Sequence, residues 1–475
     1  MHGANALALA AALFAAALRA QDSRPVAFVN ARLVVVDGPV VERGTLVVKD
    51  SLISALGKDV AAPAGALVVD CKGGSVMPGL VSAFSRAGLV PAMPRPQMAA
   101  EGPRRGGRRG FVPPVEGPRS AGPGNQAATR VVERLDARQE VFGELLRAGV
   151  TTLSLVPLGT GFPGLGALLR PDGRSLETLA QRDDAFVFVG MARESQVKKI
   201  LKEGFDKAKK IVEERKKPKE QPKPPEPKPE ARPADKPADK PAEQKTGDKP
   251  PEPKPEPKPE PKPEEKKDAA APQPPAQAPK QEEKKDPNLE VLADLLEGKR
   301  RAIVEIDSAA DLLHFVHACG EDLAFPRAIA VARHDPLSGT LDDPDAIDAV
   351  AKLKSPLLLP PELSTRPRTR YLTNPAKTLH DAGLEIAFAV GDNKETARAL
   401  FFKLMDLVRY GLPADTALAA VTLVPARMLG IDGEVGSLKA GKKANLLVFS
   451  GDPLDPTSEL RSVWLAGRQV PANQQ

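Results

Sequence analysis

The sequence has little cysteine, little aromatic content, a small net charge and few long apolar runs. Two cysteines, Cys71 and Cys319, in 475 residues allow at most one disulfide, which excludes a disulfide-framework protein. Aromatic residues make up 4% of the chain, so the base-stacking surfaces of single-strand binders are not in evidence. The net charge is +6, and after the N-terminal run no apolar stretch approaches the ~20 residues that cross a bilayer. We therefore expect no nucleic-acid partner and no transmembrane span.

Proline, by contrast, is abundant. The chain has 50 prolines, and many of them lie in Pro-Glu-Pro-Lys repeats that alternate with lysine, glutamate and alanine. Because residues 215–287 contain almost no apolar side chains, they cannot offset the entropy cost of ordering. We predict a disordered, extended insertion there, reaching roughly 200 Å at about 3.1 Å per residue. Its expected role is that of a spacer, or of a contact to the cell envelope or to another protein.

The N-terminal residues predict export. Residues 6–18 form an alanine- and leucine-rich run that has the length of a signal-peptide core and is short for a membrane span. A polar stretch follows Ala20, where cleavage is expected. We predict a signal peptide at residues 1–20 and a periplasmic or extracellular location; the alternative is an uncleaved anchor.

The rest of the chain alternates between strand and helix patterns. Short β-rich runs fill residues 26–70, and the same texture returns at 436–470. Between them, residues 131–148 predict an amphipathic helix that leads into a buried strand, and further strands and helices alternate from Leu289 onward. This order favours a parallel α/β barrel. The glycine-rich residues 159–166 lack the lysine of a phosphate loop, and we interpret them as a wide barrel loop.

Three stretches resemble the amidohydrolase superfamily. Pro78-Gly-Leu-Val-Ser-Ala-Phe-Ser-Arg86 is similar to its entry strand, Pro-Gly-Leu-Ile-Asp-x-His-x-His. Residues 436–449 resemble its strand pair, and Thr422 to Gly430 keep its Thr-x-x-Pro-Ala-x-x-Leu-Gly pattern. The closest texture is that of the imidazolonepropionase-like and dipeptidase-like branches, which hydrolyse C–N bonds of non-peptide or dipeptide substrates.

The resemblance implies a particular architecture. It implies a (β/α)8 TIM-like barrel over residues 76–433, interrupted by the insertion. It also implies a small composite β-sandwich built from residues 25–75 and 434–470, so that both ends of the chain contribute to it. A small-molecule substrate or ligand is then the expected partner, and oligomeric state is not implied.

The resemblance also implies a metal site, but the sequence departs from it. In the family a divalent metal, usually zinc, activates water, and the first strand supplies two histidines. Here Phe84 and Arg86 occupy those positions, and neither can ligate a metal. Glu305 falls where the strand-five histidine belongs, His334 keeps the strand-six position, and Asp392 fits the catalytic aspartate. The strand-four ligand cannot be placed.

Two interpretations of these residues remain open. In one, His334, Asp392 and, more weakly, Glu305 hold one zinc ion, and Asp392 is the general base of a residual hydrolase. In the other, which we favour, no metal binds, because Arg86 and Arg333 pair with the two carboxylates. The protein would then be an exported pseudoenzyme that binds a ligand or a partner.

Other polar clusters have simpler interpretations. The basic residues 104–109 suggest a polyanion contact or, as we favour, a solvated loop. His314, His317 and Cys319 suggest a metal site on a helix, but no further ligand is in view, and we expect them to lie outside the barrel. His380 is expected to be an ordinary helix residue.

Overall fold

The computed structural model describes residues 24–89, 121–192, 194–216, 285–319, 325–331, 344–365 and 369–472. The predicted signal peptide, the basic stretch 104–109, residues 217–284 of the insertion, and the site residues Arg333 and His334 lie outside these ranges. Within the described ranges, no helix combines the length and apolar character needed to cross a membrane. The described strands form two large sheets, and each sheet surrounds a core of its own.

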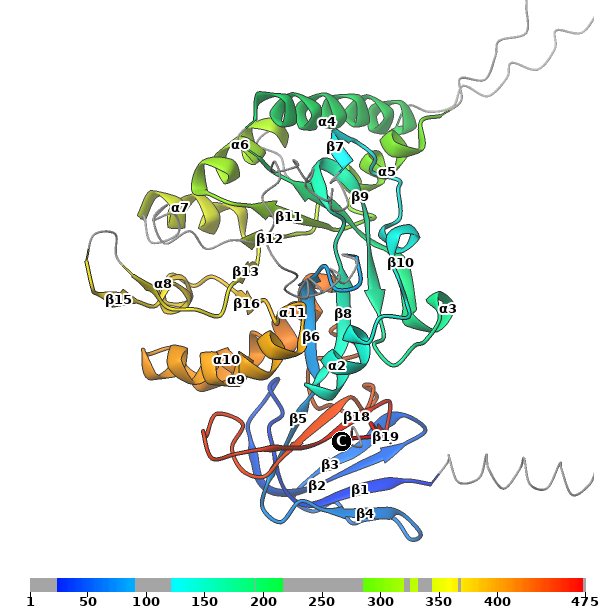
Figure 1. Cartoon of the computed structure of the whole chain (residues 1–475), viewed down its shortest axis with the longest axis vertical. Coiled ribbons are helices and arrows are strands. Elements are labelled where there is room, and N and C mark those ends of the chain that lie inside the picture. The colour runs from blue at the N-terminus through cyan, green and yellow to red at the C-terminus, as the bar shows by residue number, and fades with distance from the viewer. Residues whose placement is uncertain are drawn as a thin grey trace, which may run out of the picture. The chain divides into compact units, whose positions relative to one another are not determined.

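The first sheet combines strands from both ends of the chain (Figure 1). Its order is β19-β18-β17-β5-β1-β2-β3, with β4 paired to β1. Alternate residues of these strands, among them Phe28 and Trp464, point into one core, where the two rings meet edge to face at 5.0 Å. The strands are β1 (Val26–Leu33), β2 (Val41–Lys49), β3 (Leu52–Gly57), β4 (Leu67–Asp70), β5 (Ser75–Pro78), β17 (Leu446–Phe449), β18 (Leu460–Leu465) and β19 (Arg468–Gln469).

This sheet curls until the β3 edge meets the segment that precedes β17. Ile53 of β3 donates its N–H to the carbonyl of Lys442, and Ala444 donates to that of Ser51. The predicted composite β-sandwich is thus one hydrogen-bonded sheet that rolls over its own core, with strands from the two ends of the chain side by side.

The second sheet is the curled α/β barrel sheet, in the order β16-β13-β12-β11-β10-β9-β8-β6, with β7 paired to β9. Most neighbouring strands are parallel, but β9 is antiparallel to both β8 and β10. The strands are β6 (Leu80–Ser85), β7 (Ala121–Asn125), β8 (Val150–Leu155), β9 (Gly159–Leu169), β10 (Ala180–Gly190), β11 (Ala302–Ile306), β12 (Arg327–Val331), β13 (Leu357–Leu359) and β16 (Ile386–Phe388); a hairpin, β14 (Ser364–Thr365) with β15 (Leu372–Thr373), stands apart.

The first and last strands of the barrel sheet are joined through a connection between helices. Val81 of β6 donates its N–H to the carbonyl of Val421 at 3.0 Å, and Phe388 of β16 donates to that of Ala420 at 2.8 Å. Thr422 is buried and fixes this connection, because its Oγ1 donates to the carbonyl of Leu418 at 2.6 Å. The expected barrel is therefore a curled sheet that residues 420–421 bridge.

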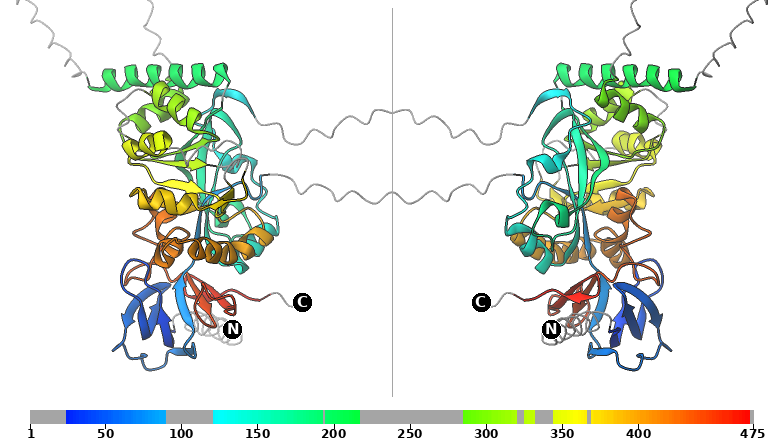
Figure 2. Two further views of the ribbon diagram at one scale, coloured as in Figure 1. Left: turned by 90° about the vertical axis from the view of Figure 1, so that its left-hand side faces the viewer. Right: turned by 90° about the vertical axis from the view of Figure 1, so that its right-hand side faces the viewer.

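Helices pack along the barrel sheet, and α4 lies against α5 and α6 (Figure 2). The helix α11 ends at Gly430, whose φ of 68° is the left-handed conformation typical of a glycine that terminates a helix. The helices are η1 (Val131–Arg134), α2 (Val141–Arg147), α3 (Leu176–Leu179), α4 (Ser195–Lys216), α5 (Pro287–Leu296), α6 (Ala309–Cys319), α7 (Pro344–Leu353), α8 (Pro375–Asp381), α9 (Lys394–Arg409), α10 (Ala414–Ala419) and α11 (Leu423–Leu429).

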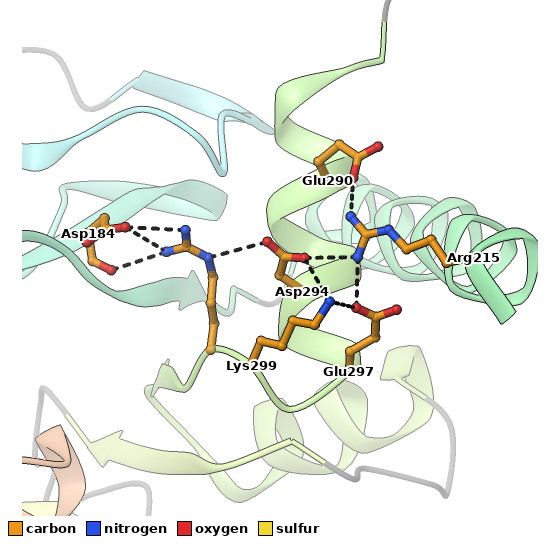
Figure 3. A network of polar contacts seen from close by, with 7 residues as sticks. Asp184, Arg215, Glu290, Asp294, Glu297 and Lys299 are labelled. Atoms are coloured by element: carbon orange, nitrogen blue, oxygen red, sulfur yellow. Dashed lines mark hydrogen bonds and ion pairs between the residues drawn. The ribbon is translucent and has the colours of Figure 1, made fainter.

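An ion network joins the two helices that flank residues 217–284. Arg215, near the end of α4, contacts Glu290, Asp294 and Glu297, which follow one face of α5 (Figure 3). The hydrogen bonds that Arg215 donates, first to Asp294 and then to Glu290, raise the pKa of Arg215. The predicted insertion therefore begins later than residue 215, because α4 continues to Lys216 and is anchored there.

Three sequence predictions about local structure are wrong. The predicted helix 131–148 is divided into η1 and α2, and the Asp136 side chain accepts a hydrogen bond from the Arg138 N–H between them, which competes with helix formation. The predicted loop 159–166 is part of β9. The barrel sheet is mixed rather than wholly parallel, because β8 and β9 form a hairpin.

Candidate functional site at the barrel mouth

Apolar side chains fill the interior of the barrel sheet. The next inward-facing residue of each strand, toward its carboxyl end, therefore lies at the mouth. The inward-facing residues are Val81, Ala83, Phe186, Phe188, Ile303, Ala328, Ala330, Leu358 and Ala387. Side chains alternate along a strand, so Glu305 follows Ile303 on the inward face of β11, at its carboxyl end. The mouth is therefore the edge at which the predicted site residues of the different strands meet.

Phe84 and Arg86 lie at this mouth. The Phe84 ring packs on the interior cluster, with its centroid 6.0 Å from that of Phe188. Arg86 lies over the Phe84 ring itself, with Cζ 5.0 Å from the Phe84 centroid. The two residues expected to replace metal-binding histidines thus form a cation–π pair that covers the barrel interior.

The predicted ion pair between Arg86 and Glu305 is confirmed. Arg86 Nη2 lies 2.6 Å from Glu305 Oε2, and the two side chains are 24% and 15% exposed. Such a shielded pair keeps much of its attraction, because little water screens it. Arg86 Nε is buried, and no hydrogen-bond partner for it lies within the described residues. The guanidinium of Arg86 therefore supplies a fixed positive charge beside Glu305.

Asp392 is held by the end of β6. Its Oδ1 accepts hydrogen bonds from Ser85 Oγ at 2.6 Å and from the Arg86 backbone N–H at 3.0 Å. Ser85 Oγ also accepts from the Ala87 N–H at 3.1 Å. The sequence predicts that Asp392 pairs with Arg86 or Arg333; among the described residues its contacts are with a hydroxyl and a backbone amide, and Arg333 lies outside them. The catalytic role of Asp392 stays a prediction.

Ser85 is the residue that sequence reasoning missed. It is fully buried at the end of β6, and its hydroxyl donates to Asp392, which lies in the segment after β16. The signal lay in its position between the two substituted residues, Phe84 and Arg86. Ser85 fixes the carboxylate of Asp392 in place, and it does so from inside the protein rather than from a solvent-facing surface.

The position beside Glu305 on β10 cannot provide a ligand. Gly190 pairs with Glu305 in the parallel register of β10 and β11. An ideal Cβ on Gly190 would lie 2.4 Å from the carbonyl oxygen of Gly159, far inside van der Waals contact. The residue of β10 in register with Glu305 is therefore a glycine, and the adjacent backbone fills the space of a side chain; the strand-four ligand stays unplaced.

The described mouth residues do not fit the zinc site that the family implies. A phenyl ring has no lone pair for a metal, and a guanidinium is a donor only. Glu305 Oε2 is engaged by Arg86, and Asp392 Oδ1 by two donors. Among the described residues, no group of three or more His, Cys, Asp or Glu side chains could hold a metal ion. His334 and Arg333 lie outside the described residues.

The residues of α6 that suggested a second metal site, His314, His317 and Cys319, differ in exposure, and His314 is half-buried. His317 of α6 is exposed, whereas Cys319 at the end of the same helix is buried, and its burial raises the pKa of the thiol. Their different environments do not form a converging set of ligands. His380 lies in the last turn of α8 and is half-buried.

The fold and site define a curled α/β barrel with a sheet domain made from both ends of the chain, and comparison with known proteins is consistent with this class. The family model "Amidohydrolase family" matches residues 363–470. A crystal structure of an amidohydrolase from Thermotoga maritima MSB8 superimposes with a TM-score of 0.63 at 18% identity, covering 94% of this chain and all of that one, and shows the same fold. Together, the family model over residues 363–470 and the short matches to curated relatives support the amidohydrolase superfamily, and the solved structure supports its fold.

Similarity to curated relatives is confined to short segments. Amidohydrolase tasK of Hapsidospora irregularis is 33% identical over 99 residues, which are 20% of this chain and 10% of that protein. Imidazolonepropionase of Rhizobium meliloti (strain 1021) is 37% identical over 114 residues, which are 23% of this chain and 27% of that protein. The matches therefore span well under half the length of these relatives.

Proposed function

We propose that this protein is a small-molecule-binding member of the superfamily, in which a fixed guanidinium replaces the metal at the strand-one positions. The observation that carries the proposal is the 2.6 Å pair of Arg86 and Glu305. Metal-dependent C–N hydrolysis would be weak or absent, because the two positions that provide metal-binding imidazoles in relatives carry a phenyl ring and a guanidinium. The barrel would then serve as a binding scaffold.

A residual hydrolase is the second candidate. Asp392 is retained and held at the mouth by Ser85, and two relatives carry the names imidazolonepropionase and N-substituted formamide deformylase. In this candidate Asp392 acts as general base on a C–N bond, and His334 and Glu305 assist in holding one zinc ion. Its substrate would be a non-peptide amide or a dipeptide.

Metal content distinguishes the two candidates. The protein is purified without chelator, and zinc is measured by mass spectrometry in the natural sequence, in Asp392→Asn and in Phe84→His/Arg86→His. We expect substoichiometric zinc in the natural protein and in Asp392→Asn, and a gain of zinc in the double variant. Stoichiometric zinc in the natural protein that Asp392→Asn abolishes, together with amide hydrolysis, would establish the hydrolase instead.

Location and reach form a separate part of the proposal. The apolar run at residues 6–18 supports export to the periplasm or the extracellular space. The composition of residues 217–284 supports a spacer that contacts the envelope or another protein. Expression in a Gram-negative host followed by fractionation and N-terminal sequencing tests the first point; retention in the cytoplasm with an intact N-terminus would contradict it.

A further inference from the structure

A second cavity, away from the Arg86–Glu305 pair, has a strongly basic lining. It encloses about 370 Å³ between α2, the start of α9 and the β18–β19 hairpin of the first sheet. Four of its lining side chains are cations and one, Glu144, is an anion. The cations are Arg147 of α2, Lys394 and Arg398 of α9, and Arg461 of β18. We call these four residues the basic quartet.

The basic quartet is uncompensated within the described part of the chain. None of its four side chains makes an ion pair or a side-chain hydrogen bond to another described residue. A cavity near the start of β11 differs in this respect: of its arginines, Arg182 pairs with Glu434 and Arg300 pairs with Asp184. Like charges that line one cavity repel each other, and a bound anion removes that repulsion.

The arrangement of the basic quartet also suits a compact ligand. Its members come from two helices and one strand, so an anion between them is approached from three elements. Arginine presents a planar fork of N–H donors that matches the oxygen pairs of phosphate and carboxylate groups. Ser462 and Gln469 add uncharged polar groups to the lining. A single chloride would leave most of these donors unused.

We infer that this cavity is a binding site for a small anion with two or more negative charges, borne on phosphate or carboxylate groups. The site is independent of the function proposed for the barrel mouth. It uses side chains that the mouth does not use, and it requires no metal.

Calorimetric titration tests this inference on the full chain. Pyrophosphate and citrate serve as separate probes at fixed ionic strength, so that the two oxyanion chemistries are compared directly. We expect saturable binding of at least one probe, weakening as salt rises. Arg147→Gln/Arg398→Gln should weaken it about tenfold or more, because two charge-assisted contacts are lost. Arg43→Gln removes an exposed arginine of β2 and is the matched control.

Thermal unfolding provides the second readout. The ligand-free double variant should unfold at the same temperature as the natural protein or higher, because the substitutions relieve repulsion. The probe should raise the unfolding temperature of the natural protein and of Arg43→Gln, and not that of the double variant. No binding of either probe at millimolar concentration would overturn the inference, as would equal loss of binding in Arg43→Gln.

Discussion

The Arg86–Glu305 pair should contribute measurably to stability, and a double-mutant cycle can isolate that contribution. The variants are Arg86→Met, Glu305→Gln and the two combined. Breaking a fully buried pair costs about 3–5 kcal/mol, whereas exposed pairs contribute about 0.2–1 kcal/mol. With side chains 24% and 15% exposed, this pair lies between those limits. We expect Arg86→Met to lower the free energy of unfolding by about 2 kcal/mol, with a coupling energy of about 1–2 kcal/mol.

The chain contains a matched control for this cycle. Arg130 and Asp183 are also 2.6 Å apart, but their side chains are 52% and 39% exposed. Their cycle, Arg130→Met with Asp183→Asn, should give a coupling energy of about 0.2–1 kcal/mol. Urea unfolding followed by circular dichroism, with reversibility checked by refolding, supplies the free energies. Equal coupling in the two cycles would refute the claim that shielding at the mouth strengthens the Arg86 pair.

Three further predictions concern other parts of the molecule. Arg215→Ala should lower the urea midpoint and speed hydrogen exchange in α5, whereas the adjacent Lys216→Ala should do neither; protection unchanged in Arg215→Ala would show that the network of Figure 3 is dispensable. Gly190→Ala should cost about 1–3 kcal/mol because its Cβ meets backbone, and Gly433→Ala, where the space is open, should cost little; equal costs would contradict this account of β10. Burial raises the pKa of Cys71 to about 11, above its unfolded value of about 8.5, so native labelling by a thiol reagent should be slow near pH 8, and the thiol's stabilising contribution should be lost as pH rises toward 11; fast native labelling near pH 8 would contradict it.

Local sequence patterns predicted many of the individual elements. The β-rich runs predicted at residues 26–70 and 436–470 correspond to β1 to β4 and to β17 to β19. These segments have a clear apolar periodicity, so the side that faces the core can be read from the chain itself.

Residues 159–166 show where such reasoning fails. Their glycines are typical of a loop, yet they pair with β10 as part of β9. An ideal Cβ on Gly166 would lie 2.0 Å from Phe186 Cζ, and one on Gly164 would lie 2.3 Å from the Thr129 carbonyl oxygen. The glycines are therefore required by neighbours distant in sequence, and no local pattern carries that information.

The site was predictable in its residue types and only partly in its contacts. An arginine in a metal-ligand position predicts a carboxylate partner by charge alone, and Glu305 is that partner. The hydrogen bond from Ser85 to Asp392 depends on how close β6 and β16, the first and last strands of the barrel sheet, come to each other. Residues 420–421 set that distance because they bridge the two strands. The sequence of the entry strand, residues 78–86, does not indicate this contact.

The positive charge of Arg86 at the mouth is balanced by two nearby carboxylates, those of Glu305 and Asp392. Arg86 contacts both carboxylates, Glu305 through its guanidinium and Asp392 through its backbone N–H. In relatives that bind a divalent metal, the ion provides the positive charge that such carboxylates need. Two carboxylates at one site repel each other, and the guanidinium of Arg86 offsets part of that repulsion at the shielded Glu305, whereas Asp392 is exposed. Phe84 covers the apolar interior through its contact with Phe188 and also supports the guanidinium of Arg86. The side chains of Phe84 and Arg86 therefore act together at the mouth, because one ring contacts both the apolar interior and the cation.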